Sequence, residues 1–390
     1  MAGSGPERRY LDNAATSWPK PPEVWAAWEH AARSIGAAPG RGTYREAIAA
    51  DAIRGRCRTA VARLLGGVDP ARVALPAGAT LAVNMAIHGL VRPGDHVIAT
   101  AADHNATLRP LHALAARGAI VLEIVPCDAA GRVDPDAVRR AWRPATRMVV
   151  LAHASNVTGC LQDAAAIAAV ARDRGGLVIL DAAQSLGVVP WPTADGAAGP
   201  CFGVDVVAGA GHKWLLGPAG TGLLWVRPGL EPEPLVQGGT GTQSDSPAMP
   251  EAFAERMEAG TPDLPALAGL LAALDWHAAA DMAAVARRCR DLATAAAERL
   301  AVVRGVRVIA APGAAAPIVG FTVGGYDPAD VAAVLETAAG VQVRAGFHCA
   351  ACIHEHLGTR AGGTVRASFG PFNTAADVEA LVTTVASLVG

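Results

Sequence analysis

Short apolar runs alternate with longer amphipathic stretches over the first two thirds of the chain. The runs VALPAG, HVIAT, RMVVLA, LVILD and VDVVA are rich in β-branched residues and predict buried strands. Helical patterns stand between them, such as QDAAAIAAVARDRGG, which ends at two glycines. This alternation of strand and helix predicts an α/β fold, with a mainly parallel sheet covered by helices on both faces.

The pattern changes in the last third of the chain. A long alanine-rich helical run begins near Gly260 and leads to shorter strands at VRVIA, PIVGFTV, VQVRAG and TVRASFG, before a closing helix. Such a mixture predicts a smaller α+β domain. We therefore expect an N-terminal arm over residues 1–20, a large domain over 21–260, and a linking helix with a small domain over 261–390. Trp25 and Trp28, at the start of the large domain, are expected to pack inside.

Composition narrows the class of protein. The chain of 390 residues suits about two domains, and 52% hydrophobic against 17% charged residues excludes disorder. A net charge of −2 gives no reason to expect a nucleic-acid partner. No apolar run reaches the roughly 18 residues of a membrane span, and the N-terminus lacks the core of a signal peptide, so we expect a cytoplasmic protein. Seven scattered cysteines do not resemble a disulfide framework.

The main candidate for chemistry is Lys213, in the glycine-rich stretch Gly209 to Gly222. It follows a predicted strand, where α/β sheets bind ligands. Such a turn can keep the amine desolvated, which favours imine formation with a carbonyl; the alternative is a solvated loop lysine. Asp181 ends the strand before it, 32 positions earlier (213 − 181). A carboxylate and an imine-forming lysine at these places are the two fixed points of a pyridoxal phosphate site.

A phosphate cradle is predicted in VALPAGATLAVNMAIHGL. This stretch reads as a strand, a turn at Gly78 and a helix that begins near Thr80. Free amides at a helix start bind phosphate, so the Ala79 amide and the Thr80 hydroxyl are candidates, with a plain N-cap as the alternative.

Four motifs, LDAAQ, GHKWLLGP, EAGTPDLP and RAGFHCA, stand in this order along the chain. Together they resemble the class V aminotransferase family of fold type I pyridoxal phosphate enzymes, and within it the cysteine desulfurase and selenocysteine lyase group. The likeness runs from Tyr10 to Thr374. It implies a mainly parallel seven-stranded sheet flanked by helices, a smaller C-terminal domain, pyridoxal 5'-phosphate as cofactor, and a homodimer.

The resemblance also implies residues that contact the cofactor. His104 would stack on the pyridine ring and transfer protons, although it could be a structural group. Asn156 and Gln184 would bond the phenolic oxygen, and Asn156 would also reach the substrate. His212 would contribute to the cradle. Thr261 is the expected N-cap of a helix starting at Pro262; the resemblance implies that it also reaches the phosphate of the partner subunit, which requires a homodimer.

One position departs from the family pattern. Relatives carry a serine or threonine phosphate ligand two places before the histidine of the HK pair, and this chain has Ala210. The missing hydroxyl would weaken cofactor binding by about 1 to 2 kcal/mol if nothing replaces it.

Arginines mark the expected substrate side. Arg366 lies within the apolar strand TVRAS, where a free guanidinium would be costly, so it should face an anion. The resemblance implies the α-carboxylate of the substrate; a structural ion pair is the alternative. Arg344 would contact the substrate from the same side. Arg41 either lies near the site or dimer contact, or is a surface residue. The segment from Asn13 to Thr16 would help to close the site.

Cys349 carries the specific activity that the resemblance implies. Its loop, RAGFHCAACIHEHLG, contains glycine and histidine and can expose a thiolate; the alternative is a small core residue. A zinc site formed by Cys349, Cys352, His354 and His356 would lack a second, separated ligand pair, so we expect no metal. Cys352 either resolves an oxidised Cys349 or is an ordinary loop thiol.

The function implied by the resemblance is conversion of L-cysteine to L-alanine, with sulfur transferred to Cys349 as a persulfide. Lys213 would remove the α-proton while Asp181 keeps the ring protonated. The alternatives are a selenocysteine lyase, a class V aminotransferase or C–S lyase acting on another amino acid, and a catalytically silent binding protein. A sulfur-acceptor protein is an expected partner, whose identity the sequence does not give.

Overall fold

The computed structural model describes residues 6–193, 200–309, 311 and 313–390. A seven-stranded sheet in the order β2-β8-β7-β6-β5-β3-β4 forms the large domain. From β4 to β7 the neighbouring strands are parallel, and β8 runs antiparallel to both β7 and β2. The strands are β2 (Val73–Ala74), β3 (His96–Thr100), β4 (Val121–Val125), β5 (Thr146–Ala152), β6 (Leu177–Asp181), β7 (Val206–Ala210) and β8 (Gly222–Val226).

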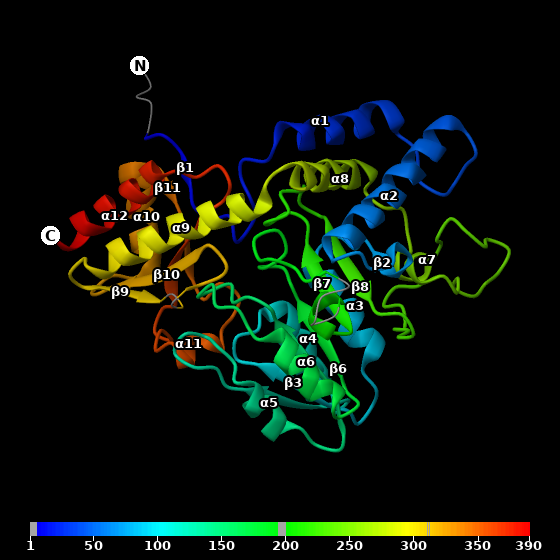
Figure 1. The fold of residues 1–390 in the computed structure, drawn as a ribbon, viewed down its shortest axis with the longest axis horizontal. Coiled ribbons are helices and arrows are strands. Elements are labelled where there is room, and N and C mark those ends of the chain that lie inside the picture. The colour runs from blue at the N-terminus through cyan, green and yellow to red at the C-terminus, as the bar shows by residue number, and fades with distance from the viewer. Residues whose placement is uncertain (1–5, 194–199, 310, 312) are drawn as a thin grey trace.

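Helices cover both faces of this sheet (Figure 1). Successive residues of a strand point to opposite faces, and in β6 Ile179 packs with one group of helices while Leu180 packs with the other. Both sides are therefore buried, which explains why the central strands are continuously apolar. One face carries α3 (Ala79–Leu90), α4 (Asn105–Ala116) and α7 (Phe253–Met257); the other carries α2 (Arg45–Leu64), α5 (Pro135–Ala141), α6 (Ala164–Arg172) and α8 (Leu264–Ala279).

The small domain is built on a four-stranded antiparallel sheet in the order β12-β13-β10-β9, at the left of Figure 1. Its strands are β9 (Val306–Ile309), β10 (Ile318–Val323), β12 (Arg344–Gly346) and β13 (Thr364–Ser368), and its helices are α9 (Met282–Ala301), α10 (Pro328–Ala339), α11 (Ile353–His356) and α12 (Ala375–Val389). The predicted fold class, a parallel sheet flanked by helices with a smaller α+β domain, is confirmed.

The predicted single helical run from Gly260 is two helices. It breaks at Ala280, and Asp281 caps α9 by accepting a hydrogen bond from Ala284 N at 3.0 Å. Leu267 and other apolar residues of α8 belong to the core of the large domain, whereas Ala293 and Leu300 of α9 belong to that of the small one. The change of packing partner therefore falls between the two helices.

The start of α8 differs from the prediction. The helix was expected at Pro262 with Thr261 as its N-cap, but it begins at Leu264. The side chain of Asp263 accepts a hydrogen bond from Ala266 N at 3.0 Å, so the carboxylate satisfies the first turn in place of the threonine. The prediction that Thr261 caps the helix is wrong.

An N-terminal arm joins the two domains. Its strand β1 (Arg9–Tyr10) pairs in parallel with β11 (Val341–Gln342) of the small domain. Farther along, Ser17 N donates to the carbonyl of His212 at 3.0 Å, in the turn that carries Lys213. The arm then enters α1 (Pro22–His30), which lies along α8 (Figure 1).

The prediction that Trp25 and Trp28 pack inside is wrong. They are 50% and 39% exposed, because α1 buries only a narrow stripe around Val24.

In the described part of the chain, no helix combines the length and apolarity needed to cross a membrane. Nor do the described residues bring three or more His, Cys, Asp or Glu side chains together as a metal site.

Candidate active site

Seven of the predicted functional residues line one cavity at the carboxyl ends of the central strands. Lys213 follows β7, Asp181 ends β6, and Asn156 follows β5. Parallel strands place their carboxyl ends at one edge of the sheet, which explains how residues far apart in the chain meet there. The cavity is lined by Ala79, Thr80, His104, Asn156, Asp181, Gln184 and Lys213, together with small alanines.

Lys213 is partly buried in the wall of this cavity. Burial lowers its pKa to about 8, although Asp181 acts in the opposite direction. The free amine is therefore far more abundant near neutral pH than for an exposed lysine. Such an amine can act as a nucleophile toward an aldehyde or as a general base.

Asp181 is 5% exposed and accepts a hydrogen bond from Ala183 N at 3.0 Å. Burial raises the pKa of this carboxyl, while the backbone hydrogen bond and Lys213 lower it. A cation beside a buried carboxylate stabilises its charged form, and a protonated pyridine nitrogen is such a cation.

His104 lies four residues after the end of β3 (104 − 100) rather than on the strand itself. The strand stops because the Asp103 carboxylate, and not a neighbouring strand, accepts a hydrogen bond from Thr100 N at 2.7 Å. His104 Nδ1 accepts from Ala106 N at 3.0 Å, and burial with nearby Lys213 lowers its pKa to about 4. The ring is therefore neutral at pH 7 and carries its proton on Nε2, ready to donate into the cavity.

Asp103 is a site residue that the sequence did not indicate. It is fully buried and ties two strand ends together, since its other oxygen accepts from Ala152 N at 2.6 Å. Burial raises its pKa to about 7. Its position between two loops that supply cavity residues makes it part of the frame of the site.

Buried polar atoms without partners show where a ligand is needed. Among the described residues, Asn156 Oδ1, His212 Nδ1 and Arg366 Nε find no hydrogen-bond partner. Buried polar groups are normally satisfied, so these atoms mark places for a polar ligand. Gln184 differs, because Trp214 Nε1 donates to its Oε1 at 2.8 Å and its Nε2 donates to Ala14 O at 2.9 Å. It keeps one N–H for a ligand.

The start of α3 fits an anion. The helix begins at Ala79 after Gly78, whose φ of 132° favours glycine, and no side chain caps it. The first amide groups of a helix have no acceptors within the helix, and they lie at the positive end of its dipole. They can therefore bind an anion such as a phosphate group. Ala210 on β7 is 3% exposed, and its methyl group adds no hydroxyl to this cradle.

Arg366 is buried, with 1% of its surface exposed. Its Nη2 lies 2.7 Å from Asp12 Oδ1 in the N-terminal arm, and its Nη1 donates to Asn156 O at 3.0 Å. The arginine thus has an internal ion pair, the alternative left open by the sequence, and its Nε remains available. Asp12 was not identified from the sequence because its partner lies 354 positions away.

The loop of Cys349 reaches the cavity from the small domain. His348 and Cys349 both have left-handed backbones, with φ of 51° and 59°, which is unusual for residues other than glycine. Two hydrogen bonds hold this shape: Asn156 Nδ2 donates to His348 O at 2.6 Å, and Asn105 N donates to Cys349 O at 2.7 Å. Arg344 Nη2 lies 3.3 Å from Cys349 Sγ. The loop is therefore attached directly to cavity residues.

The other histidine of this loop has a structural place. His354 Nδ1 bonds Thr359 Oγ1 at 2.8 Å, and its Nε2 lies 3.2 Å from Phe347 O. Cys352 occupies the N-cap position of the short helix α11 without a capping hydrogen bond from its side chain, and burial raises the pKa of its thiol.

Two predicted residues, Thr261 and Arg41, line other hollows than the Lys213 cavity. Thr261 is exposed and lines a separate hollow with Leu81 and Met85. Arg41 is also exposed, and its Nη2 donates to Gly239 O at 3.3 Å beside the loop of residues 237–250. In a single chain neither residue reaches the cavity.

Comparison with known proteins agrees with this architecture. The family model for aminotransferase class-V matches residues 9–381. A probable cysteine desulfurase of Methanothermobacter thermautotrophicus is 32% identical, with 98% of this chain and 94% of the relative covered. Cysteine desulfurase CsdA of Escherichia coli is 33% identical over 96% of this chain and 92% of its own length.

Solved structures give the same result. The apo structure of the cysteine desulfurase from Thermococcus onnurineus superposes with a TM-score of 0.88 at 28% identity, covering 97% of this chain and 94% of that one. The structure of Escherichia coli CsdA has a TM-score of 0.86 at 31% identity, with the same coverage. The whole-length match, the ordered strand-end residues and the Cys349 loop together place the chain in the aminotransferase class-V family.

Proposed function

We propose that this protein is a pyridoxal 5'-phosphate-dependent cysteine desulfurase that converts L-cysteine to L-alanine and receives the sulfur on Cys349. The observation that supports it best is the Cys349 loop, which is bonded to Asn156 and Asn105 beside the Lys213 cavity. The relatives named cysteine desulfurase extend over nearly the whole chain, which adds support.

The residues present suit the cofactor. Lys213 would hold its aldehyde, Asp181 its ring nitrogen, and the first turn of α3 with Thr80 and His212 its phosphate. When bound, the cofactor supplies a sink for the electrons released as the substrate loses its α-proton. Asn156 Oδ1 and His212 Nδ1 are free for polar contacts with this group.

The chain's own groups perform the remaining steps. Arg366 Nε and the Arg344 guanidinium would bind the substrate carboxylate. Lys213, with its pKa of about 8, accepts the α-proton, and His104 holds a proton on Nε2 within the same cavity. The Cys349 thiolate then attacks the substrate sulfur. A sulfur–sulfur bond forms, the carbon–sulfur bond breaks with its electrons left on carbon, and a proton returns there to give alanine.

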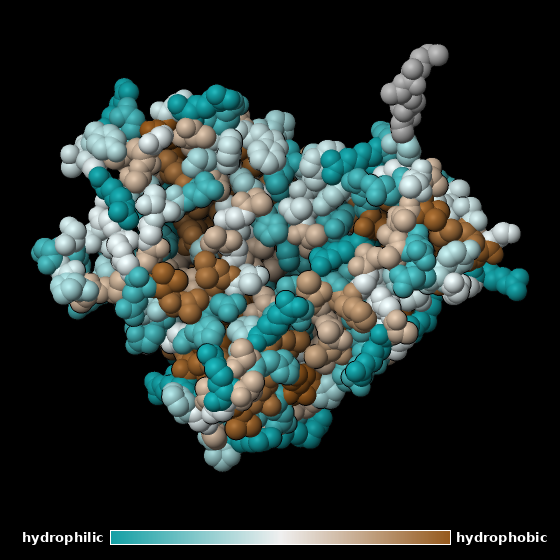
Figure 2. Space-filling view, turned by 180° about the vertical axis from the view of Figure 1, so that it is seen from behind, coloured by the Kyte–Doolittle hydropathy of each residue, from teal (hydrophilic) through white to brown (hydrophobic). Residues whose placement is uncertain are grey.

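A homodimer would complete the site. Thr261 and Leu81 share an exposed hollow, and Arg41 lines a second one with the glycine-rich loop near Gly239. Seen from behind, the large-domain side of the molecule carries hydrophobic residues within a hollow (Figure 2). We infer that a second copy covers these surfaces and brings Thr261 to the partner's phosphate cradle. A sulfur-acceptor protein would then take the sulfur from Cys349 in the cytoplasm, where thiols stay reduced.

Substitution of Cys349 tests the function. Cys349→Ser should bind cysteine and change the cofactor absorption, because Lys213, Asp181 and Arg366 are intact. It should lose alanine release from cysteine by at least about a hundredfold, because the attacking sulfur is gone. Mass spectrometry of the wild type after brief exposure to cysteine should find one added sulfur atom at Cys349.

Cys352→Ser is the matched control and should retain alanine release, because Cys352 occupies the N-cap position of α11 and its thiol makes no capping hydrogen bond. Undiminished alanine production by Cys349→Ser would contradict the sulfur-transfer mechanism and favour a lyase or aminotransferase. Parallel assays with selenocysteine separate the desulfurase from a selenocysteine lyase, which would turn over selenocysteine without Cys349.

A further inference from the structure

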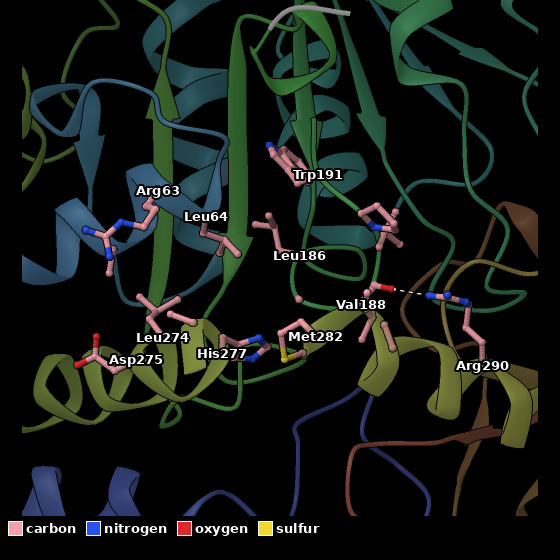
Figure 3. A pocket seen from close by; sticks show the side chains of 17 residues that line it. Arg63, Leu64, Leu186, Val188, Trp191, Leu274, Asp275, His277, Met282 and Arg290 are labelled. Atoms are coloured by element: carbon pink, nitrogen blue, oxygen red, sulfur yellow. Dashed lines mark hydrogen bonds between the residues drawn. The ribbon is translucent and has the colours of Figure 1, made fainter. Parts of the chain in front are cut away.

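A second cavity, separate from the one around Lys213, lies on the large domain. It has a volume of about 510 Å³ and is enclosed by the end of α2, the end of α8, the start of α9 and the segment that follows β6 (Figure 3). Apolar side chains form most of its wall, including Leu64, Leu186, Leu274, Met282 and Trp191. Its size and apolar lining are typical of small-molecule sites. None of its lining residues belongs to the Lys213 cavity.

Two buried polar groups in this wall lack a hydrogen-bond partner among the described residues, Trp191 Nε1 and His277 Nε2. His277 lies between Leu274 and Met282 in Figure 3 and is 6% exposed. Its Nε2 makes no hydrogen bond with any described residue. Burial lowers its pKa to about 4, so the ring is neutral at pH 7. A buried imidazole nitrogen in an apolar wall requires a polar partner, which a ligand can supply.

Positive charge is available at the edges of the cavity. Arg290 extends from α9, and its Nη1 donates to Val188 O at 3.1 Å, drawn as a dashed line in Figure 3. Arg63 lies toward the other end in Figure 3, where Asp275, 3.4 Å from Arg56, also lines the cavity. Within the described parts of the chain, neither Arg63 nor Arg290 forms an ion pair with a carboxylate. The Arg290 end therefore has a charge that an anion can neutralise.

We propose that this cavity binds an amphipathic monocarboxylate, whose carboxylate meets Arg290 and whose apolar body lies against Leu64, Leu186 and Leu274. An acid of about six to ten carbons suits a cavity of this size. A polar substituent on the body of the acid, such as a hydroxyl group, would bond His277 Nε2. An amine at this end would face Arg290 without compensation, and the carboxylate in the wall, Asp275, already lies 3.4 Å from Arg56.

The cavity lies directly behind the turn that presents Lys213. Gly187 packs so closely that a Cβ added to it would stand 2.6 Å from Trp214 O and 3.2 Å from His277 Cε1. Trp214 follows Lys213 in the chain, and its indole nitrogen donates to Gln184 at 2.8 Å. A ligand in the cavity thus lies one layer of residues away from the proposed cofactor contacts, and Trp191 in the wall provides an optical signal.

Octanoate binding to the purified full-length protein tests the proposal. Titration calorimetry should show saturable binding, with a matching change in tryptophan fluorescence. Octylamine should not bind, and octanol should bind at least about tenfold more weakly than octanoate, because it lacks the charge. Arg290→Gln should weaken octanoate binding by about tenfold. Leu274→Trp, which fills the cavity, should abolish it.

Arg287→Gln is the matched control, since this residue lies on the same helix but does not line the cavity. It should bind octanoate as the wild type does. The proposal is overturned if the wild type shows no saturable binding, if Leu274→Trp binds normally, or if octanol binds as well as octanoate. Thermal melts of each variant confirm that the fold is retained, and because the readout is binding, the result does not depend on desulfurase activity.

Discussion

Asp12 and Arg366 form the most deeply buried ion pair of the site. The arginine is 1% exposed on its side chain and the aspartate 21%, and Arg366 Nη2 lies 2.7 Å from Asp12 Oδ1. Burial lowers the arginine pKa, and Asp12 opposes this. The carboxylate therefore keeps the guanidinium charged and oriented within an apolar strand.

Asp12→Ala should destabilise the protein more than an ordinary surface substitution. Removing one partner of a buried pair leaves an uncompensated charge, which costs about 3 to 5 kcal/mol. Because Asp12 is partly exposed, we expect a loss of about 2 to 3 kcal/mol in the free energy of unfolding, measured by urea denaturation.

Glu29→Ala is the control for this prediction. Glu29 and Arg33 lie 2.7 Å apart but are 59% and 77% exposed, so removing that pair should cost less than about 1 kcal/mol. Equal losses in the two variants would show that the Asp12 pair contributes no more than a surface contact.

At the scale of elements, the N-terminal arm holds the Lys213 turn. Lys20 Nζ donates to Ser17 Oγ at 2.9 Å and to the carbonyl of His212 at 3.3 Å. Lys20 and Lys213 are the only two lysines in the sequence, and arginine provides every other basic side chain that is not histidine. An arginine stays charged under all ordinary conditions, whereas a buried lysine can lose its proton.

The burial of Lys20 predicts a specific pH dependence of stability. Burial lowers its pKa from 10.5 to about 8, so between these values the unfolded chain binds a proton that the folded chain does not. Stability should therefore rise with pH in this range. The wild type should gain about 2 kcal/mol relative to Lys20→Met between about pH 7.5 and 9.5, measured by urea unfolding of each protein. A constant difference across this range would mean that Lys20 titrates normally.

Elements with a strong local signal were predicted well. Lys213, Asp181 and Asn156 come together because each follows a continuous apolar strand, and parallel strands end at one edge. The expected cofactor and the expected role of Cys349 came from the family resemblance, because local patterns cannot give them.

Predictions failed where two local signals compete or where partners are distant in the chain. Asp263 and Thr261 are both good caps, and only packing decides between them. The exposure of Trp25 depends on how α1 meets α8. Asp12 and Lys20 could not be assigned because their partners lie 354 and 192 positions away.

At the scale of the whole molecule, the proposed homodimer determines whether the site is complete. Leu81 is 36% exposed and lines the hollow that contains Thr261. Leu81→Glu should dissociate the dimer, because it places a charge in an apolar contact, and should reduce alanine production strongly. Sedimentation velocity measures the first effect and a product assay the second.

Val302→Glu provides the comparison, since this residue is 85% exposed on the small domain. It should remain dimeric and active. If the wild type sediments as a fully active monomer, Thr261 has no role in a partner's site.

The pairing of β1 with β11 has a consequence for how the protein is made. Arg9 is paired with Val341, so the arm must wait for 332 further residues (341 − 9) before its strand partner exists. At about 5 to 20 residues per second, a ribosome needs on the order of half a minute for this length. The large-domain sheet can form during that time, but the arm can dock fully only near the end of translation. Chains that are released before β11 is made would therefore have the Lys213 turn but no partner for β1. The N-terminal arm could then not hold that turn, and such chains would not become active.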